Sequence, residues 1–166
     1  MLFRSDGGNG DDILDPGIGN DQVDGGSGVD ILRINYSTLG SDVRLSFTAT
    51  GTGAISCTGS SVSFSNIEAY DIKTGAGNDW LIGSTLNDTL ISGAGSDTLN
   101  GGGGVDVLSG GSGDDVYIIT DDNASIIEEA SGGYDEVVTS INFSLADKPY
   151  LEGLMLTGSA NLTVTG

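Results

Sequence analysis

A nine-residue pattern, with one apolar side chain among polar residues and glycines, recurs in two parts of the chain. The apolar positions are Leu14, Val23, Leu32, Leu81, Leu90, Leu99, Leu108 and Tyr117. An apolar residue flanked by polar neighbours is typical of a strand that faces a core on one side only. The pattern therefore predicts a series of strands of about three residues, joined by tight turns of about six.

An aspartate stands two positions before each of these apolar residues, and within each part the spacing is nine. The aspartates are Asp12, Asp21 and Asp30, then Asp79, Asp88, Asp97, Asp106 and Asp115. Glycine lies two positions before every one of them except Asp88, where Leu86 takes its place. Glycine adopts positive φ readily and lets backbones approach closely, so it suits a tight turn. Isolated turns are also rich in Asp and Gly, but eight units in one register indicate a repeat.

Two units of nine predict one coil of 18 residues, in which each turn stacks on the turn two units later, about 4.8 Å away. Stacking brings the aspartates of alternate units together beside backbone carbonyl oxygens. Such an all-oxygen set favours Ca²⁺ over zinc or copper, and Mg²⁺ would need a stricter octahedron. The chain contains no His, which removes the imidazole ligands of zinc.

The units read Gly-Gly-x-Gly-x-Asp-x-apolar-x and resemble the RTX repeats of secreted bacterial toxins, proteases, lipases, epimerases and adhesins. The resemblance implies an all-β fold, a parallel β-roll (β-solenoid) with several calcium ions in the turns. It also implies the ligands. The earlier turn supplies the carbonyls of its second and fourth residues, the later turn those of its first and third, and both supply their aspartate.

Carried over to this chain, the resemblance implies four sites, each formed by an earlier and a later turn. The sets are Gly8, Gly10 and Asp12 with Gly25, Ser27 and Asp30; Gly75, Gly77 and Asp79 with Ser92, Ala94 and Asp97; Gly93, Gly95 and Asp97 with Gly110, Ser112 and Asp115; and Ser84, Leu86 and Asp88 with Gly101, Gly103 and Asp106. Ser84 and Leu86 replace glycines, so we expect that turn to be distorted. The turn with Gly17, Gly19 and Asp21 fits the repeat, but we expect an incomplete site because Leu39 lies 18 residues after Asp21. In total we expect roughly four to seven ions.

The repeats divide the chain into a first block at 7–33 and a second block at 74–118. The segment 34–73 between them alternates apolar and polar residues, and together with the end of the first block it predicts strands near 31–36, 43–47, 61–64 and 67–72. We expect this insertion to continue the roll as wider coils. A small independent sheet is the alternative.

The last segment, 119–166, has fewer glycines and predicts further strands near 125–127, 137–138, 143–145 and 151–158. The end of a solenoid exposes apolar side chains and unpaired backbone. We therefore expect this segment to cap the roll, and a partner- or glycan-binding surface is the alternative.

Charge and composition exclude several classes of protein. The chain has 24 acidic and 5 basic residues, a net charge of −19, whereas nucleic-acid binding needs a basic surface. No apolar run approaches the about 18 residues of a membrane-spanning helix. A His-Glu-x-x-His motif is impossible, and the chain has no Gly-x-Ser-x-Gly motif. A pair of carboxylates could still hydrolyse a glycoside, but the turns already explain most aspartates, so we expect no enzyme. Cys57 is the only cysteine, and we expect it to be a small buried residue.

The resemblance implies a calcium-binding module of a larger secreted bacterial protein, which passes through type I secretion unfolded and folds on Ca²⁺ outside the cell. Residues 1–4 contain no apolar stretch like that of a signal peptide, which favours another export route or an excised fragment. We expect the fragment to be monomeric. The alternative function is an adhesin module that binds a polysaccharide or a surface. Ice binding would need a regular outward row, which the varied third positions of the repeats do not offer.

Overall fold

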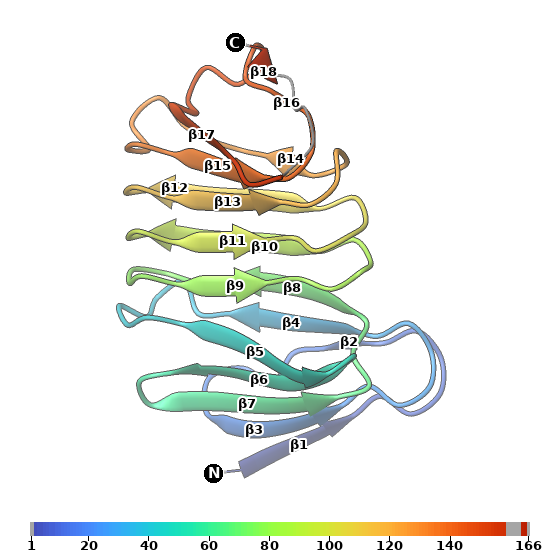
Figure 1. Ribbon diagram of the computed structural model, residues 1–166. Coiled ribbons are helices and arrows are strands. Elements are labelled where there is room, and N and C mark those ends of the chain that lie inside the picture. Colours follow the sequence, from blue (N-terminus) through green and yellow to red (C-terminus); the bar gives the residue numbers. More distant parts are fainter. Residues whose placement is uncertain (1, 159–163, 166) are drawn as a thin grey trace.

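The computed structural model describes residues 2–158 and 164–165, and this part of the chain forms strands and turns without any helix. The strands are the rungs of a flattened coil, with the two termini at opposite ends (Figure 1). Two long sheets face each other across the core, and a short sheet lies near the C-terminus. No described segment is a helix able to cross a membrane.

Sheet 1 has ten strands and sheet 2 has six. The order in sheet 1 is β1 (Leu2–Asp6), β3 (Asn20–Asp24), β7 (Ser60–Ser65), β6 (Thr52–Cys57), β5 (Arg44–Ala49), β9 (Trp80–Ile82), β11 (Thr98–Asn100), β13 (Val116–Ile119), β15 (Glu136–Thr139) and β17 (Gly153–Leu156). The order in sheet 2 is β14 (Ser125–Ile126), β12 (Val107–Ser112), β10 (Thr89–Ala94), β8 (Ala69–Lys73), β4 (Ile31–Asn35) and β2 (Ile13–Leu14). The short sheet pairs β16 (Phe143–Ser144) with β18 (Val164–Thr165).

The parallel register confirms the 18-residue coil. Leu81 pairs with Leu99 and Leu99 with Tyr117 in sheet 1, while Leu90 pairs with Leu108 in sheet 2. All five side chains are fully buried. The single apolar residue of each unit therefore builds the core, and because each fully buried Leu contributes only about 1.5–3 kcal/mol, this core is thin for the length of chain that it must order. The predicted parallel β-roll is confirmed.

The strands of the insertion lie in the same two sheets as those of the repeats. Its strands β5, β6 and β7 join sheet 1 as an antiparallel meander, and β8 joins sheet 2. It therefore does not form a sheet of its own. Strand β6 has no counterpart among the predicted strands, since its sequence TGAISC lacks a clear alternation of large apolar residues. Phe47, Phe64 and Tyr70 pack edge to face inside this coil, with ring centroids 5.3–6.1 Å apart. Cys57, expected to be a small buried residue, is partly buried against the core.

The last segment adds further coils to the same two sheets. Strand β14 extends sheet 2, and β15 and β17 extend sheet 1. The spacing is no longer 18, because Val116 pairs with Glu136 and Glu136 with Gly153. The segment thus covers the end of the repeat block, as a cap would, and its capping role stays a prediction.

Candidate metal sites

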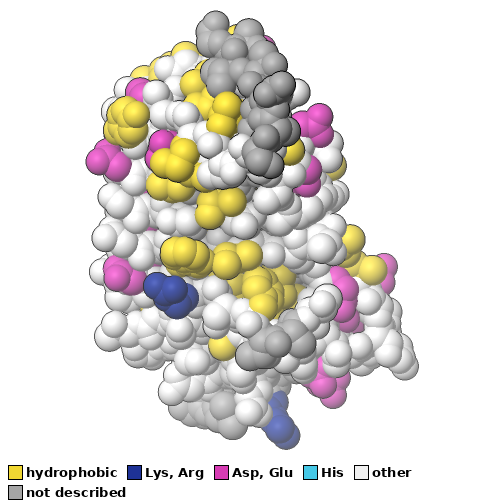
Figure 2. Space-filling view, in the orientation of Figure 1, with side chains coloured by type: hydrophobic (Ala, Val, Ile, Leu, Met, Phe, Trp, Pro, Cys, Tyr) yellow, Lys and Arg dark blue, Asp and Glu magenta, His cyan; other side chains and the backbone are white. Residues whose placement is uncertain are grey.

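The turns of the roll lie in two columns, one along each side of the flattened coil (Figure 1). Column 1 contains the stacked aspartate turns that lead from sheet 1 to sheet 2, and column 2 contains the stacked aspartate turns that lead back. The aspartates of column 1 are Asp12, Asp30, Asp88 and Asp106, and those of column 2 are Asp79, Asp97, Asp115 and Asp135. On the face shown in Figure 2, acidic side chains gather mainly toward these two sides of the molecule.

Within each column, one carboxylate oxygen binds the backbone of the coil below. The N–H of Asp79 donates to Oδ1 of Asp97 at 2.8 Å, and the N–H of Asp97 donates to Oδ1 of Asp115 at 2.8 Å. The same bond joins Asp12 to Asp30 at 2.9 Å and Asp88 to Asp106 at 3.0 Å. All four predicted pairs of turns are therefore stacked directly.

The second carboxylate oxygen is the one that a cation could bind. Oδ2 is buried without a hydrogen-bond partner in Asp12, Asp30, Asp97, Asp115 and Asp135. A methyl group at Gly7 would lie 2.9 Å from Oδ2 of Asp12 and 2.4 Å from the carbonyl oxygen of Gly25. These two predicted ligands thus converge on the space that glycine leaves open. Buried polar atoms without partners are rare and costly, so these oxygens fit a bound cation.

The predicted carbonyl ligands also bond to the neighbouring coil. The Gly8 carbonyl accepts the Ser27 N–H at 2.8 Å, and the Ser27 carbonyl accepts the Gly10 N–H at 2.7 Å. The first of these bonds recurs in two other pairs of turns. The Gly75 carbonyl accepts the Ala94 N–H, and the Ser84 carbonyl accepts the Gly103 N–H. A carbonyl oxygen has two lone pairs, so each can accept this bond and still face a cation. Which carbonyls bind Ca²⁺ stays a prediction.

Two turns differ from the glycine-only pattern. The hydroxyl of Thr74 contacts Oδ2 of Asp79 and lies 2.8 Å from the Ser92 carbonyl oxygen, so it fills the space that Gly7 leaves open. In the turn expected to be distorted, the N–H of Ser84 donates to Oδ2 of Asp88 at 2.5 Å. Oδ2 is therefore already partnered in both turns.

Burial raises the pKa of six aspartates of the second repeat block and the turn that follows it. The pKa rises to about 6 for Asp79 and Asp88 and to about 7 for Asp115, and neighbouring acidic side chains add to the effect. The pKa values of Asp97, Asp106 and Asp135 are raised for the same first reason. In the described part of the chain the one ion pair joins Arg33 and Asp71, at 2.8 Å, on sheet 2 rather than in a column. The columns thus hold buried like charges without basic partners, an environment that a divalent cation would neutralise.

The structure also places acidic residues in the columns that the sequence pattern did not identify. The N–H of Asp30 donates to Oε2 of Glu68 at 3.0 Å, so Glu68 stands where the next coil would carry an aspartate. Asp135 takes the same position above Asp115, at 2.9 Å. Below Asp79 the corresponding residue is Val43, and the nearby carboxylate is that of Asp42, which accepts the N–H of Asn78 at 2.8 Å. Two features of the sequence could have indicated these positions. Glu68 lies in the sequence Asn-Ile-Glu, and Asp135 has a Gly two positions before it, as the repeat aspartates do.

Asp21 lies apart from both columns. It is opposite Val62 of β7, not opposite another turn. The turn before it contacts Ser60, whose hydroxyl lies 2.7 Å from the Gly19 carbonyl oxygen and 2.9 Å from the Tyr36 hydroxyl. The structure therefore does not bring Gly17, Gly19 and Asp21 together with a second repeat turn.

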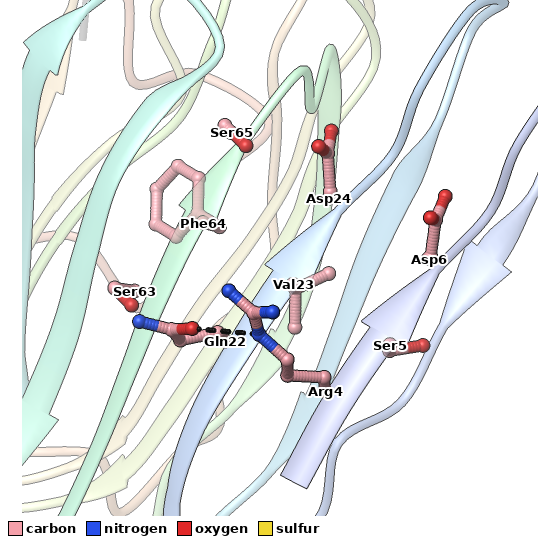
Figure 3. Close-up of a pocket in the computed structure, with 9 residues that line it drawn as sticks. All are labelled: Arg4, Ser5, Asp6, Gln22, Val23, Asp24, Ser63, Phe64 and Ser65. Atoms are coloured by element: carbon pink, nitrogen blue, oxygen red, sulfur yellow. Dashed lines mark hydrogen bonds between the residues drawn. The ribbon is translucent and has the colours of Figure 1, made fainter. Parts of the chain in front are cut away.

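A polar groove of about 400 Å³ lies across β1, β3 and β7 (Figure 3). Its lining includes Arg4, whose Nε donates to Oε1 of Gln22 at 3.0 Å, and the carboxylates of Asp6 and Asp24. An apolar pocket of about 440 Å³ is lined by residues that include Phe47, Tyr70 and Leu86. Neither contains a predicted site residue other than Ser84 and Leu86 at the rim of the apolar pocket.

Stacked turns that present carboxylate and carbonyl oxygens define the class of calcium-binding β-rolls. The family model of the RTX calcium-binding nonapeptide repeat (4 copies) matches residues 4–32, 71–85 and 82–117. The two repeat blocks belong to this family, whose repeats are structural and typical of secreted bacterial proteins. No curated protein matches the chain.

Proposed function

We propose that this calcium-binding roll is a module of a larger secreted bacterial protein, exported unfolded by type I secretion and folded by Ca²⁺ outside the cell. The observation that carries the proposal is the buried, unpartnered Oδ2 of Asp12, Asp30, Asp97 and Asp115. At low calcium these oxygens would enter the fold as uncompensated charges, whereas millimolar Ca²⁺ provides their ligand.

Calcium would reduce two electrostatic costs of folding, the burial of ionised aspartates and the repulsion between the many acidic residues. Because the pKa values of Asp79, Asp88 and Asp115 are higher in the metal-free fold than in the unfolded chain, ionisation of these carboxyls at neutral pH reduces the stability of that fold. The net charge of −19 adds general repulsion. About four divalent ions would add eight positive charges and bring the net charge to about −11. Each ion also joins two coils, so binding stabilises the stack in a way that the thin apolar core does not.

The proposed ligands are those of the four stacked pairs of turns. Each pair would bind one ion through its two aspartates and the carbonyls that face the space between them, with Ca²⁺–O distances of about 2.3–2.6 Å. We further propose that the module has no catalytic role of its own, since its aspartates serve the turns. The ion supplies charge compensation and a cross-link between coils.

Limited proteolysis tests the proposal. The chain is produced in a bacterial cytosol, and the cells are lysed either in chelator or in millimolar Ca²⁺. A protease should digest the chain in chelator within a time during which it stays intact in millimolar Ca²⁺. Mg²⁺ at the same concentration is the matched control and should protect little, because it prefers a stricter octahedral site. Equal resistance in chelator and in Ca²⁺ would show that the roll folds without calcium and would remove the basis for export in an unfolded form.

A further inference from the structure

Three carboxylates meet just beyond the last nonapeptide, at the junction between the repeat block and the final segment. One oxygen each of Asp115, Glu128 and Asp135 lies within 4.8 Å of the other two. Asp115 belongs to the last repeat turn, whereas Glu128 follows β14 and Asp135 precedes β15. Elsewhere in residues 2–158 and 164–165, no other three His, Cys, Asp or Glu side chains gather this closely.

Two of these carboxylates carry a buried oxygen without a partner. Asp115 and Asp135 are each 1% exposed, and Oδ2 of both has no hydrogen bond. Their Oδ1 atoms are already used, since they accept the N–H groups of Asp97 and Asp115 at 2.8 and 2.9 Å. The unpartnered oxygens are thus a second observation that points to a ligand, independent of the clustering of acids.

Oxygens of Glu128 and Asp135 face a shared space beside Gly132. A methyl group at Gly132 would lie 2.8 Å from Oε2 of Glu128, 2.9 Å from Oδ2 of Asp135 and 3.1 Å from the carbonyl oxygen of Gly111. Gly111 lies in the last repeat turn, so oxygens from two successive coils converge here. A side chain at position 132 would fill this space, and glycine leaves it open.

Tyr117 holds Glu128 in place. The buried Tyr117 hydroxyl donates to Oε1 of Glu128 and accepts the N–H of Gly110 at 2.6 Å. Oε2 accepts the N–H of Glu129 at 3.3 Å and lies beside the space that Gly132 leaves open. No described Lys or Arg pairs with any of the three carboxylates, since Arg33–Asp71 is the only ion pair among all the residues that the structure describes. Three acidic groups are therefore oriented toward one another without a basic counter-charge.

We infer that Asp115, Glu128 and Asp135, with the carbonyl oxygen of Gly111, form a further Ca²⁺ site that fastens the final segment to the repeat block. The inference rests on the proposed calcium-dependent folding. This site differs from the repeat sites in two ways. Glu128 lies outside the nonapeptides, and the two aspartates, Asp115 and Asp135, are 20 residues apart instead of 18. With three carboxylates in place of the two of a repeat site, this junction site has the higher ligand charge, and ligand charge raises Ca²⁺ affinity. The ion links β13 to β15 through the turns that precede them.

Glu128→Gln tests the inference, with Glu129→Gln as the matched control. Both variants remove one negative charge from adjacent residues, but Glu129 is exposed and lies outside the triad. Native mass spectrometry of the calcium-saturated full chain counts the ions, and hydrogen exchange reports on β15 and β17. We expect Glu128→Gln to bind one ion fewer than the wild type, with at least roughly tenfold faster exchange in these strands, as the loss of one charged interaction implies. Glu129→Gln should match the wild type.

The outcomes separate this inference from the proposed function. If the wild type binds no Ca²⁺, the proposed function fails. If the wild type binds several ions and Glu128→Gln binds the same number with unchanged exchange, the junction site is wrong while the function stands. Should Glu128→Gln fail to fold, a crystal structure of the calcium-loaded wild type decides. An ion within about 2.3–2.6 Å of all three carboxylates supports the site, and water or empty density there overturns it.

Discussion

Asp97→Ala removes a carboxylate that faces two neighbouring coils. Its Oδ1 accepts the Asp79 N–H at 2.8 Å, and its Oδ2 is buried without a partner. Its own N–H donates to Asp115, so the residue lies between an aspartate below and one above. In the proposed scheme it contributes to two ions, and the variant should lose up to two.

The structure also gives the size of the effect on folding. The substitution removes a hydrogen bond to a charged acceptor and leaves the buried Asp79 amide unpaired, a loss of about 1.5–3 kcal/mol. If about four ions bind during folding, about 3 kcal/mol is offset by a calcium concentration roughly three- to fourfold higher at the midpoint. The loss of one or two ions would shift the midpoint further.

Asp21→Ala is the matched control, because Asp21 is also buried and also belongs to a repeat, but lies opposite Val62 outside both columns. Ion counting by calorimetry or mass spectrometry, with the calcium midpoint from circular dichroism, compares the two. Asp21→Ala should lose one ion or none. Equal loss of ions in the two variants would refute the pairing of alternate turns and the proposed ligand sets.

Three further predictions concern protonation, capping and close backbone contact. In chelator, acidification should increase β content: the pKa of Asp115 is about 7 in the fold and near 3.8 when unfolded, so the metal-free fold is most stable below about 4 and loses stability as pH rises toward 7. Circular dichroism in EDTA at pH 4.5 and 7.5 checks this, and identical spectra would contradict it. Deleting residues 119–166 should raise the calcium midpoint and cause self-association, because Leu108 and Tyr117 lose the coil that covers them. A monomeric truncated chain with an unchanged midpoint, by light scattering and circular dichroism, would exclude capping. Gly26→Ala should destabilise the roll more than Gly8→Ala: both residues have positive φ, at +97° and +92°, but only at Gly26 would the new methyl group lie 2.2 Å from the Gly8 carbonyl oxygen. The calcium midpoints of the two variants measure the difference, and equal shifts would contradict it.

The repeat blocks could be predicted from the sequence because a single apolar residue in each nine-residue unit builds the core. Leu81, Leu90 and Leu99 each supply the only large core side chain of their unit, so the spacing in the sequence is the spacing of the coils. The insertion was harder, because Phe47, Phe64 and Tyr70 fill a wider core with aromatic packing that no fixed period describes.

The ends of the columns could not be read from spacing. Backbone hydrogen bonds between coils determine where a turn stacks, and they tolerate two extra residues before Asp135 and a glutamate in place of an aspartate at Glu68. A search for aspartates at intervals of nine misses both. Glu128 is further from the pattern, since only the folded chain brings it to Asp115.

Calcium titration of the metal-free chain, followed by far-ultraviolet circular dichroism, tests the central claim most directly. The chain should be largely unfolded in excess EDTA at pH 7.5 and should gain β structure cooperatively on adding Ca²⁺, with a midpoint above about 10⁻⁵ M, as in extracellular calcium modules. A spectrum in EDTA that already has the full β content, unchanged by millimolar Ca²⁺, would contradict the claim that calcium binding by the stacked aspartates folds the roll.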